Sequence, residues 1–154
     1  MENERENCSF SPPPRRLPID SPLQPPHAAV MTAILQVALG GAIGAVLRYL
    51  TGIGVLRLFG TTPMPLGVLT VNVLGAGLAG LFVAYAAQRG LTHLSPLIVT
   101  GILGGFTTFS AFSLEAVALY ERGALGLAAL YVLANVTLSL GALMLGLALG
   151  RSFA

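Results

Sequence analysis

The sequence predicts an all-α membrane protein with four transmembrane helices. Hydrophobic residues make up 55% of the 154 positions and charged residues only 9%, whereas a soluble domain carries about 25% charged residues. Four long apolar stretches cover residues 32–55, 66–87, 95–119 and 124–149. Each is long enough to cross a hydrocarbon core of about 30 Å, which takes about 20 helical residues. The stretches lack the period-2 alternation of membrane-spanning strands, which favours helices.

The first 30 residues differ in composition from the rest of the chain. They hold seven of the ten prolines and four of the six acidic residues, and such a segment has too little apolar surface to offset the entropy of ordering. We therefore expect a disordered tail over residues 1–30 and a transmembrane domain over residues 31–154. Because the membrane-like pattern starts at Met31, translation that begins at this methionine is an equal alternative.

The loop arginines do not favour one orientation in the membrane. Arg89 and Arg151 lie on the side where the first helix begins, and Arg57 and Arg122 lie on the other side. Arg15 and Arg16 add to the first side if the tail is part of the protein. An excess of loop arginine normally sets the orientation of a bundle, so a chain that starts at Met31, with two arginines on each side, can insert both ways. Four short helices are too few to surround a path for a solute across the bilayer, so we expect a homo-oligomer. The small net charge of +2 excludes a nucleic-acid partner, and the single Cys8 excludes an internal disulfide.

Polar residues inside the apolar stretches are candidate functional groups, because they are costly in lipid. Asn72 lies midway along the second stretch, where it either forms an interhelical hydrogen bond or donates to a polar path. The fourth stretch carries three polar residues at i, i+4 spacing, which puts them on one helix face, either as a polar ladder or as a helix contact: Tyr131, Asn135 and Ser139. Arg48 and Glu115 lie toward helix ends, where they either reach the headgroups or, for Arg48, supply positive potential to an anion vestibule.

The third stretch contains the most unusual segment, GILGGFTTFSAFS at residues 101–113. Two adjacent glycines followed by two threonines make a weak centre for a helix, and we predict that residues 104–108 are unwound. Opened carbonyls at bilayer depth are tolerated only where they face protein, an ion or water. Phe109 and Phe112 share a face directly after this segment. The positive edge of a phenyl ring can meet an anion, although rings at this spacing more often contact lipid or the core.

Three segments resemble the signatures of the CrcB/Fluc family of fluoride channels. Residues 104–113 (GGFTTFSAFS) are similar to the family's GG-x-TTFSTFS, residues 40–49 (GGAIGAVLRY) to its GGxxGAxxRY, and residues 65–75 (PLGVLTVNVLG) to its GTLxVNxxG. The resemblance covers about residues 32–150. The chain departs from the pattern where Ala111 and Val68 replace threonines, and Asn135 varies a position that is often serine.

This resemblance implies a passive fluoride-selective ion channel that lowers cytoplasmic fluoride and is not an enzyme. It implies a multi-pass protein of the plasma membrane, the inner membrane of a bacterium, that forms an antiparallel, dual-topology homodimer. A structural sodium ion (Na+) at the dimer centre would be bound by the backbone carbonyls of Gly104 and Thr107. The positions that match the fluoride path are Asn72, Phe109, Phe112, Ser110, Tyr131, Asn135 and Ser139. Arg48 matches the family's first-helix arginine, and Glu115 a carboxylate near one end of the pore.

Three other classes of protein fit the sequence less well. A small four-helix, proton-coupled multidrug exporter needs a buried carboxylate early in the chain, and the first stretch has no acidic residue. An intramembrane enzyme would need a serine–histidine or a paired-aspartate site. This chain has neither, because no apolar stretch contains a histidine and Asp20 is the only aspartate. A purely structural subunit remains an alternative, but scaffolding gains nothing from opened carbonyls.

Overall fold

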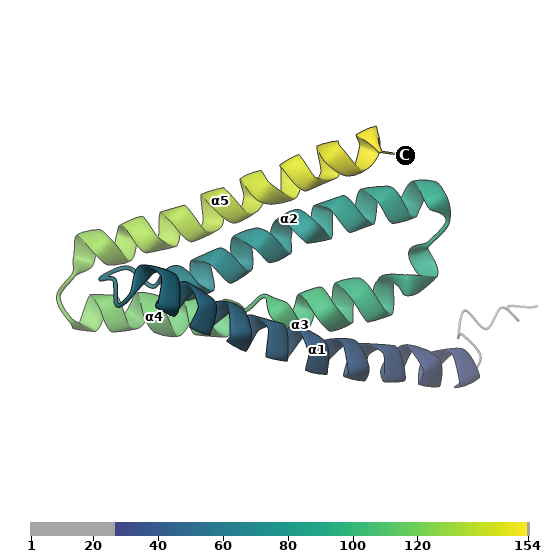
Figure 1. Cartoon of the computed structure of the whole chain (residues 1–154), viewed down its shortest axis with the longest axis horizontal. Coiled ribbons are helices and arrows are strands. Elements are labelled where there is room, and N and C mark those ends of the chain that lie inside the picture. Colours follow the sequence, from purple (N-terminus) through teal and green to yellow (C-terminus); the bar gives the residue numbers. More distant parts are fainter. Residues whose placement is uncertain (1–26, 154) are drawn as a thin grey trace, which may run out of the picture.

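The computed structural model describes residues 27–153, and all regular secondary structure within this range is helical. Three of the four spans are single helices: α1 (His27–Phe59), α2 (Leu66–Arg89) and α5 (Leu125–Ser152). The third span runs through four pieces: η1 (Thr92–Leu94), the π-helix η2 (Pro96–Leu103), α3 (Gly104–Phe106) and α4 (Phe109–Glu121) (Figure 1). All four spans are long and apolar enough to cross a membrane. The prediction of four transmembrane helices is confirmed.

The first helix is longer than its apolar stretch. α1 begins at His27, so residues 27–30, which we assigned to the tail, are helical. These residues contain no proline or glycine and continue the helix without cost. At the other end α1 stops at Phe59, because Gly60 turns the chain with a φ of +67°, a conformation that glycine adopts readily. The rest of the expected tail, residues 1–26, lies outside the described residues.

Two closely packed helix pairs make up the fold. α2 lies along α5, and α1 lies along η2 and α3 (Figure 1). Glycines line both contacts: a Cβ on Gly146 would overlap the main chain of Gly77 and Leu81, and a Cβ on Gly40 or Gly44 would overlap the main chain of η2. In lipid no hydrophobic effect drives helices together, so close backbone approach supplies the van der Waals contact instead.

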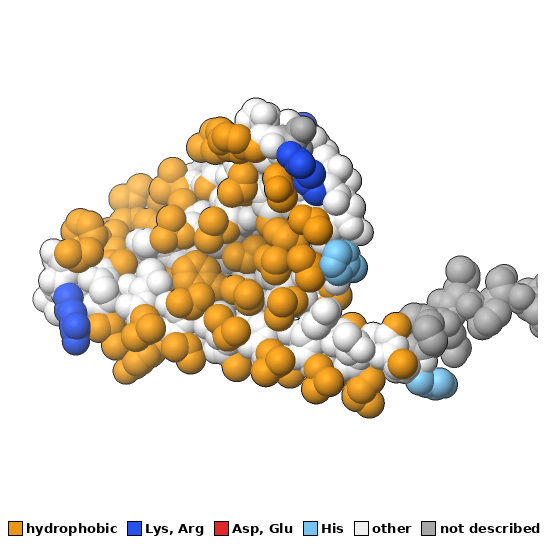
Figure 2. Space-filling model, turned by 45° about the vertical axis from the view of Figure 1, so that its right-hand side comes forward, with side chains coloured by type: hydrophobic (Ala, Val, Ile, Leu, Met, Phe, Trp, Pro, Cys, Tyr) orange, Lys and Arg blue, Asp and Glu red, His pale blue; other side chains and the backbone are white. Residues whose placement is uncertain are grey.

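The outer surface of the subunit is apolar along its length. Figure 2 shows hydrophobic side chains over most of the visible face, with arginine side chains at two opposite ends of it. Several large apolar side chains are more than half exposed: Leu35, Leu39, Leu74, Leu133 and Met144. Such a band between charged ends fits a hydrocarbon layer between two polar surfaces. The chain is a multi-pass membrane protein.

The third span is broken, as predicted, but over a shorter segment. Gly104–Phe106 stay helical, and only Thr107 (φ −76°, ψ 156°) and Thr108 (φ −152°, ψ 120°) are extended. A Cβ on Gly105 would overlap the main chain of Gly41 on α1. Gly105 therefore allows α1 to approach and does not unwind the helix. The prediction that the unwound segment begins at Gly104 is wrong.

We expect Gly146→Ala to destabilise the subunit, because the new methyl group meets the α2 backbone, which cannot move aside without separating the helices. Overpacking of this kind costs about 1–3 kcal/mol. The matched control is Gly141→Ala on the same helix, where a Cβ meets nothing within 4 Å. Thermal unfolding in detergent should give a lower midpoint for Gly146→Ala only; equal midpoints for the two variants would contradict the packing of α2 on α5.

Candidate functional site

The break in the third span is held by the side chain of Asn72 on α2. The N–H of Thr108 donates to Asn72 Oδ1 at 2.9 Å, and Asn72 Nδ2 donates to the carbonyl oxygen of Thr108 at 3.2 Å. A buried main-chain polar group needs a partner, and no water supplies one at bilayer depth. One amide thus bonds to both main-chain groups of Thr108, at the point where the helix is interrupted.

The same hydrogen bonds release two carbonyl oxygens. In a continuous α-helix the N–H of Thr108 would donate to Gly104, and the N–H of Ala111 would donate to Thr107. Here the Thr108 N–H donates to Asn72, and the Ala111 N–H donates to Thr108 Oγ1 at 3.2 Å. The carbonyls of Gly104 and Thr107 therefore lack their helical donors, and Gly104 is exposed on the surface of the subunit.

The amide of Asn72 also reaches α5. Its Nδ2 donates to Asn135 Oδ1 at 3.1 Å, so the interhelical hydrogen bond considered for Asn72 is present. Asn135 is 5% exposed. Its Nδ2 and the Ser139 Oγ one turn further are buried and have no hydrogen-bond partner among residues 27–153. Two buried donors on α5 are left without an acceptor inside the subunit.

A cavity of about 410 Å³ collects most of the residues assigned to the fluoride path. Its lining includes Asn72, Thr107, Thr108, Phe109, Phe112, Asn135 and Ser139. The Phe109 and Phe112 ring centroids lie 5.3 Å apart, but Phe109 is 79% exposed and Phe112 only 8%. Ser110 is exposed and pairs with Thr108, with 3.1 Å between the two hydroxyl oxygens.

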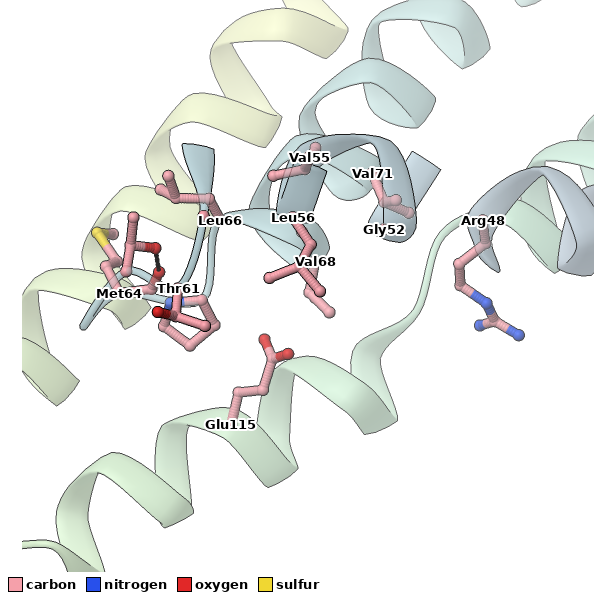
Figure 3. Close-up of a pocket in the computed structure, with 14 residues that line it drawn as sticks. Arg48, Gly52, Val55, Leu56, Thr61, Met64, Leu66, Val68, Val71 and Glu115 are labelled. Carbon is pink, nitrogen blue, oxygen red and sulfur yellow. Dashed lines mark hydrogen bonds between the residues drawn. The ribbon is translucent and has the colours of Figure 1, made fainter. Parts of the chain in front are cut away.

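A second cavity, of about 370 Å³, lies among α1, the 60–65 loop, α2 and α4. Figure 3 shows Glu115 pointing into it from α4, with Arg48 on α1 at its other end. The hydroxyl of Tyr131 donates to Glu115 Oε2 at 2.6 Å. Tyr131 is fully buried, and its ring lies 5.6 Å from that of Phe112. Tyr131, assigned to the fluoride path, lines neither cavity, but it contacts Phe112 of the first and Glu115 of the second.

Thr108 is the central residue that the sequence reasoning missed. Its main chain is bound by Asn72, and its side chain accepts from Ala111 and caps α4. Threonine is a favoured N-cap residue, so the position of Thr108 directly before the apolar residues 109–121 was an available signal. Gly75 was also missed: a Cβ there would overlap the Thr107 side chain, so this glycine makes room for the break.

These features define a class of small helical membrane protein in which one span is interrupted beside buried, unpaired hydrogen-bond donors. Residues 35–147 match the family model described as CrcB-like protein, Camphor Resistance (CrcB). A relative from Ruegeria sp. (strain TM1040) is 62% identical over 122 residues, which cover 79% of this chain and 97% of the relative. A relative from Roseobacter denitrificans is 57% identical over 122 residues, which again cover 79% of this chain and 97% of the relative. Both are named fluoride-specific ion channel FluC. The chain belongs to the CrcB family, as its motifs predicted.

We expect Tyr131→Phe to lower stability, because it leaves the Glu115 carboxyl group without the hydroxyl that it accepts from. A hydrogen bond to a charged group contributes about 1.5–3 kcal/mol. Tyr120→Phe removes the same atom from a side chain that is 63% exposed and serves as the control. Thermal unfolding in detergent should separate the two variants, and an unchanged midpoint for Tyr131→Phe would show that this bond contributes nothing to the fold.

Proposed function

We propose that this chain is a fluoride-selective channel that lets fluoride leave the cytoplasm passively, across the plasma membrane of a bacterium. The family and the names of its relatives support this function. The structural observation that carries it is the pair of buried, unpaired donors, Asn135 Nδ2 and Ser139 Oγ. A bare charge in a medium of low dielectric is penalised by tens of kcal/mol in the idealised Born estimate, so an anion path must supply fixed donors in place of water.

The cavity around these donors has the chemistry that a small, strongly accepting anion requires. The donors lie on α5, and the rings of Phe109 and Phe112 lie on α4. Ring edges carry partial positive charge, so they attract an anion without being able to protonate it. A narrow path of donors and ring edges favours fluoride over chloride, because fluoride is smaller and accepts stronger hydrogen bonds. No step in such a path requires an enzyme's chemistry.

A second, antiparallel copy of the chain completes the proposed path. The cavity that holds the unpaired donors is bordered by Phe109, which is 79% exposed, and polar groups that face lipid are costly. A second copy would cover this opening. The loop arginines from residue 31 onward, two on each side, support insertion in both orientations, which an antiparallel pair requires.

Sodium is part of this proposal, because the backbone of the break fits a hard cation. The Gly104 and Thr107 carbonyls lack their helical donors, and carbonyl oxygens are ligands that such cations accept. Two copies would supply four of these oxygens. When bound, the ion supplies a fixed positive charge, which lowers the energy of a nearby anion in a poorly screened interior.

We expect proteoliposomes that contain only this purified chain to release fluoride without a proton gradient, and to release chloride far more slowly. Phe109→Ile should slow fluoride release, and Phe109→Ile with Phe112→Ile should slow it by at least about tenfold, or about 1.4 kcal/mol in barrier height. A fluoride electrode measures the release directly. Chloride release as fast as fluoride release, or proton-driven release of organic cations alone, would overturn the function.

The matched control for the phenylalanine variants is Leu114→Ile. Leu114 lies on the same helix, is 72% exposed and does not line the cavity, so its replacement should leave fluoride release unchanged. The single Phe109 variant is informative by itself, because this exposed ring can be replaced without opening the core around Phe112. Wild-type rates in both phenylalanine variants would remove the ring edges from the path.

We expect both orientations of the chain in one membrane. In a Cys8→Ser background, a cysteine that replaces the exposed His93 lies in the connection between α2 and η2. A membrane-impermeant thiol reagent should label about half of the molecules in intact cells and the remainder only after permeabilisation, because the loop arginines from residue 31 onward favour neither side. Labelling of all molecules from one side would contradict dual insertion.

A further inference from the structure

The orientation of the Asn72 amide is fixed by the broken backbone. The oxygen and nitrogen of an asparagine amide can exchange places by a flip of the side chain, but Thr108 presents one donor and one acceptor. Oδ1 must face the Thr108 N–H at 2.9 Å, and Nδ2 must face the Thr108 carbonyl at 3.2 Å. Only one of the two orientations satisfies both bonds.

This fixed amide in turn sets the orientation of Asn135. The remaining hydrogen of Asn72 Nδ2 points toward α5, where it needs an acceptor, and Asn135 Oδ1 accepts it at 3.1 Å. With its oxygen engaged, Asn135 has its Nδ2 turned away from Asn72 and toward the Tyr131 hydroxyl, buried and without a hydrogen bond of good geometry in the described part of the chain. The order of contacts runs from the Thr108 main chain through Asn72 to Asn135.

Ser139, one turn further on α5, is also kept as a donor. Hydroxyls inside these helices commonly donate to the carbonyl four residues earlier, as Thr137 does to Leu133 and Ser113 does to Phe109. The Ser139 hydroxyl makes no such bond. It lines the same cavity as Asn135, so two unsatisfied donors lie about 6 Å apart along one helix face.

We propose that Asn72 is a positioning residue: by binding the Thr108 main chain, it locks the Asn135 amide so that its N–H groups, and not its oxygen, face the anion path. This inference rests on the proposed fluoride function. A hydroxyl, such as that of Ser139, both donates and accepts. A locked amide can only donate. It therefore selects for a species that accepts hydrogen bonds, and Asn135 is a specificity-determining residue that depends on Asn72.

A double-mutant cycle tests this dependence. Asn72→Asp still accepts from the Thr108 N–H, but it cannot donate to Asn135 Oδ1. It accepts from Asn135 Nδ2 instead, which turns the Asn135 oxygen toward the path. Asn135→Ser has no amide to turn, and its hydroxyl rotates freely.

In fluoride-release assays we expect Asn72→Asp to cost at least about 100-fold when residue 135 is asparagine, and less than about tenfold in the Asn135→Ser background. The negative charge at position 72 acts equally in both backgrounds and cancels from the cycle. Thr137→Val, between the two donors on α5 but outside the cavity lining, should release fluoride at the wild-type rate. An equal loss of fluoride release in both backgrounds overturns the positioning role. The fluoride function is tested separately by the unmodified chain, which must release fluoride in the same assay.

A spectroscopic readout keeps the proposal testable if Asn72→Asp does not fold. The chain has four asparagines, Asn3, Asn7, Asn72 and Asn135, so ¹⁵N-asparagine labelling gives few side-chain signals. The side-chain signals of the wild-type Asn135 amide should shift with sodium fluoride and not with sodium chloride. A folded Asn72→Asp variant should lose this shift, and Thr137→Val should keep it. The same fluoride shift in a folded Asn72→Asp variant, or no response to fluoride in a chain that conducts it, overturns the inference.

Discussion

The pairing of the Asn72 amide with the main chain of Thr108 is the interaction on which the rest of the site depends. A helix interrupted at bilayer depth exposes polar groups that cost several kcal/mol each when left unpaired. Asn72 supplies an acceptor and a donor to the same residue, at 2.9 and 3.2 Å. The main chain of Thr108 is therefore satisfied without water, whereas the carbonyls of Gly104 and Thr107 stay free of helical bonds. One side chain from α2 thus sets which backbone oxygens the third span offers.

The two closely packed helix pairs place this interaction. η2 and α3 are held to α1 by glycine contacts, while α2 is held to α5 in the same way. The break at Thr107 and Thr108 lies where the third span passes from the first pair to the second. Gly75, one turn from Asn72, leaves space for the Thr107 side chain. The glycines therefore act at two levels, since they bring the spans together and keep the space beside α2 in which the break fits.

The sequence predicts the four spans and the broken helix because these depend on local properties. Apolar length identifies each span, and two threonines at residues 107 and 108 weaken the helix where it ends. The extent of the break was wrong because a glycine that lowers helix propensity and a glycine at a helix contact are the same residue type; only the neighbour, Gly41 on α1, distinguishes Gly105. The spacing of Tyr131, Asn135 and Ser139 placed them on one face, but no pattern within one helix reveals partners across the bundle. Asn72 meets Asn135 across 63 positions, and Glu115 meets Tyr131 across 16.

The positions that depart from the family pattern leave the main-chain part of the site intact. Ala111 lacks the hydroxyl of a threonine, yet α4 is capped through its N–H, which any residue except proline provides. Val68 lines the Glu115 cavity without a hydroxyl, and Tyr131 supplies the hydroxyl that Glu115 accepts instead. Asn135 is the one departure that adds a group, because its amide binds Asn72 and still leaves donors unpaired. The break can therefore stay the same while side chains around it vary, since its geometry depends on Asn72 and on backbone atoms that most residues carry.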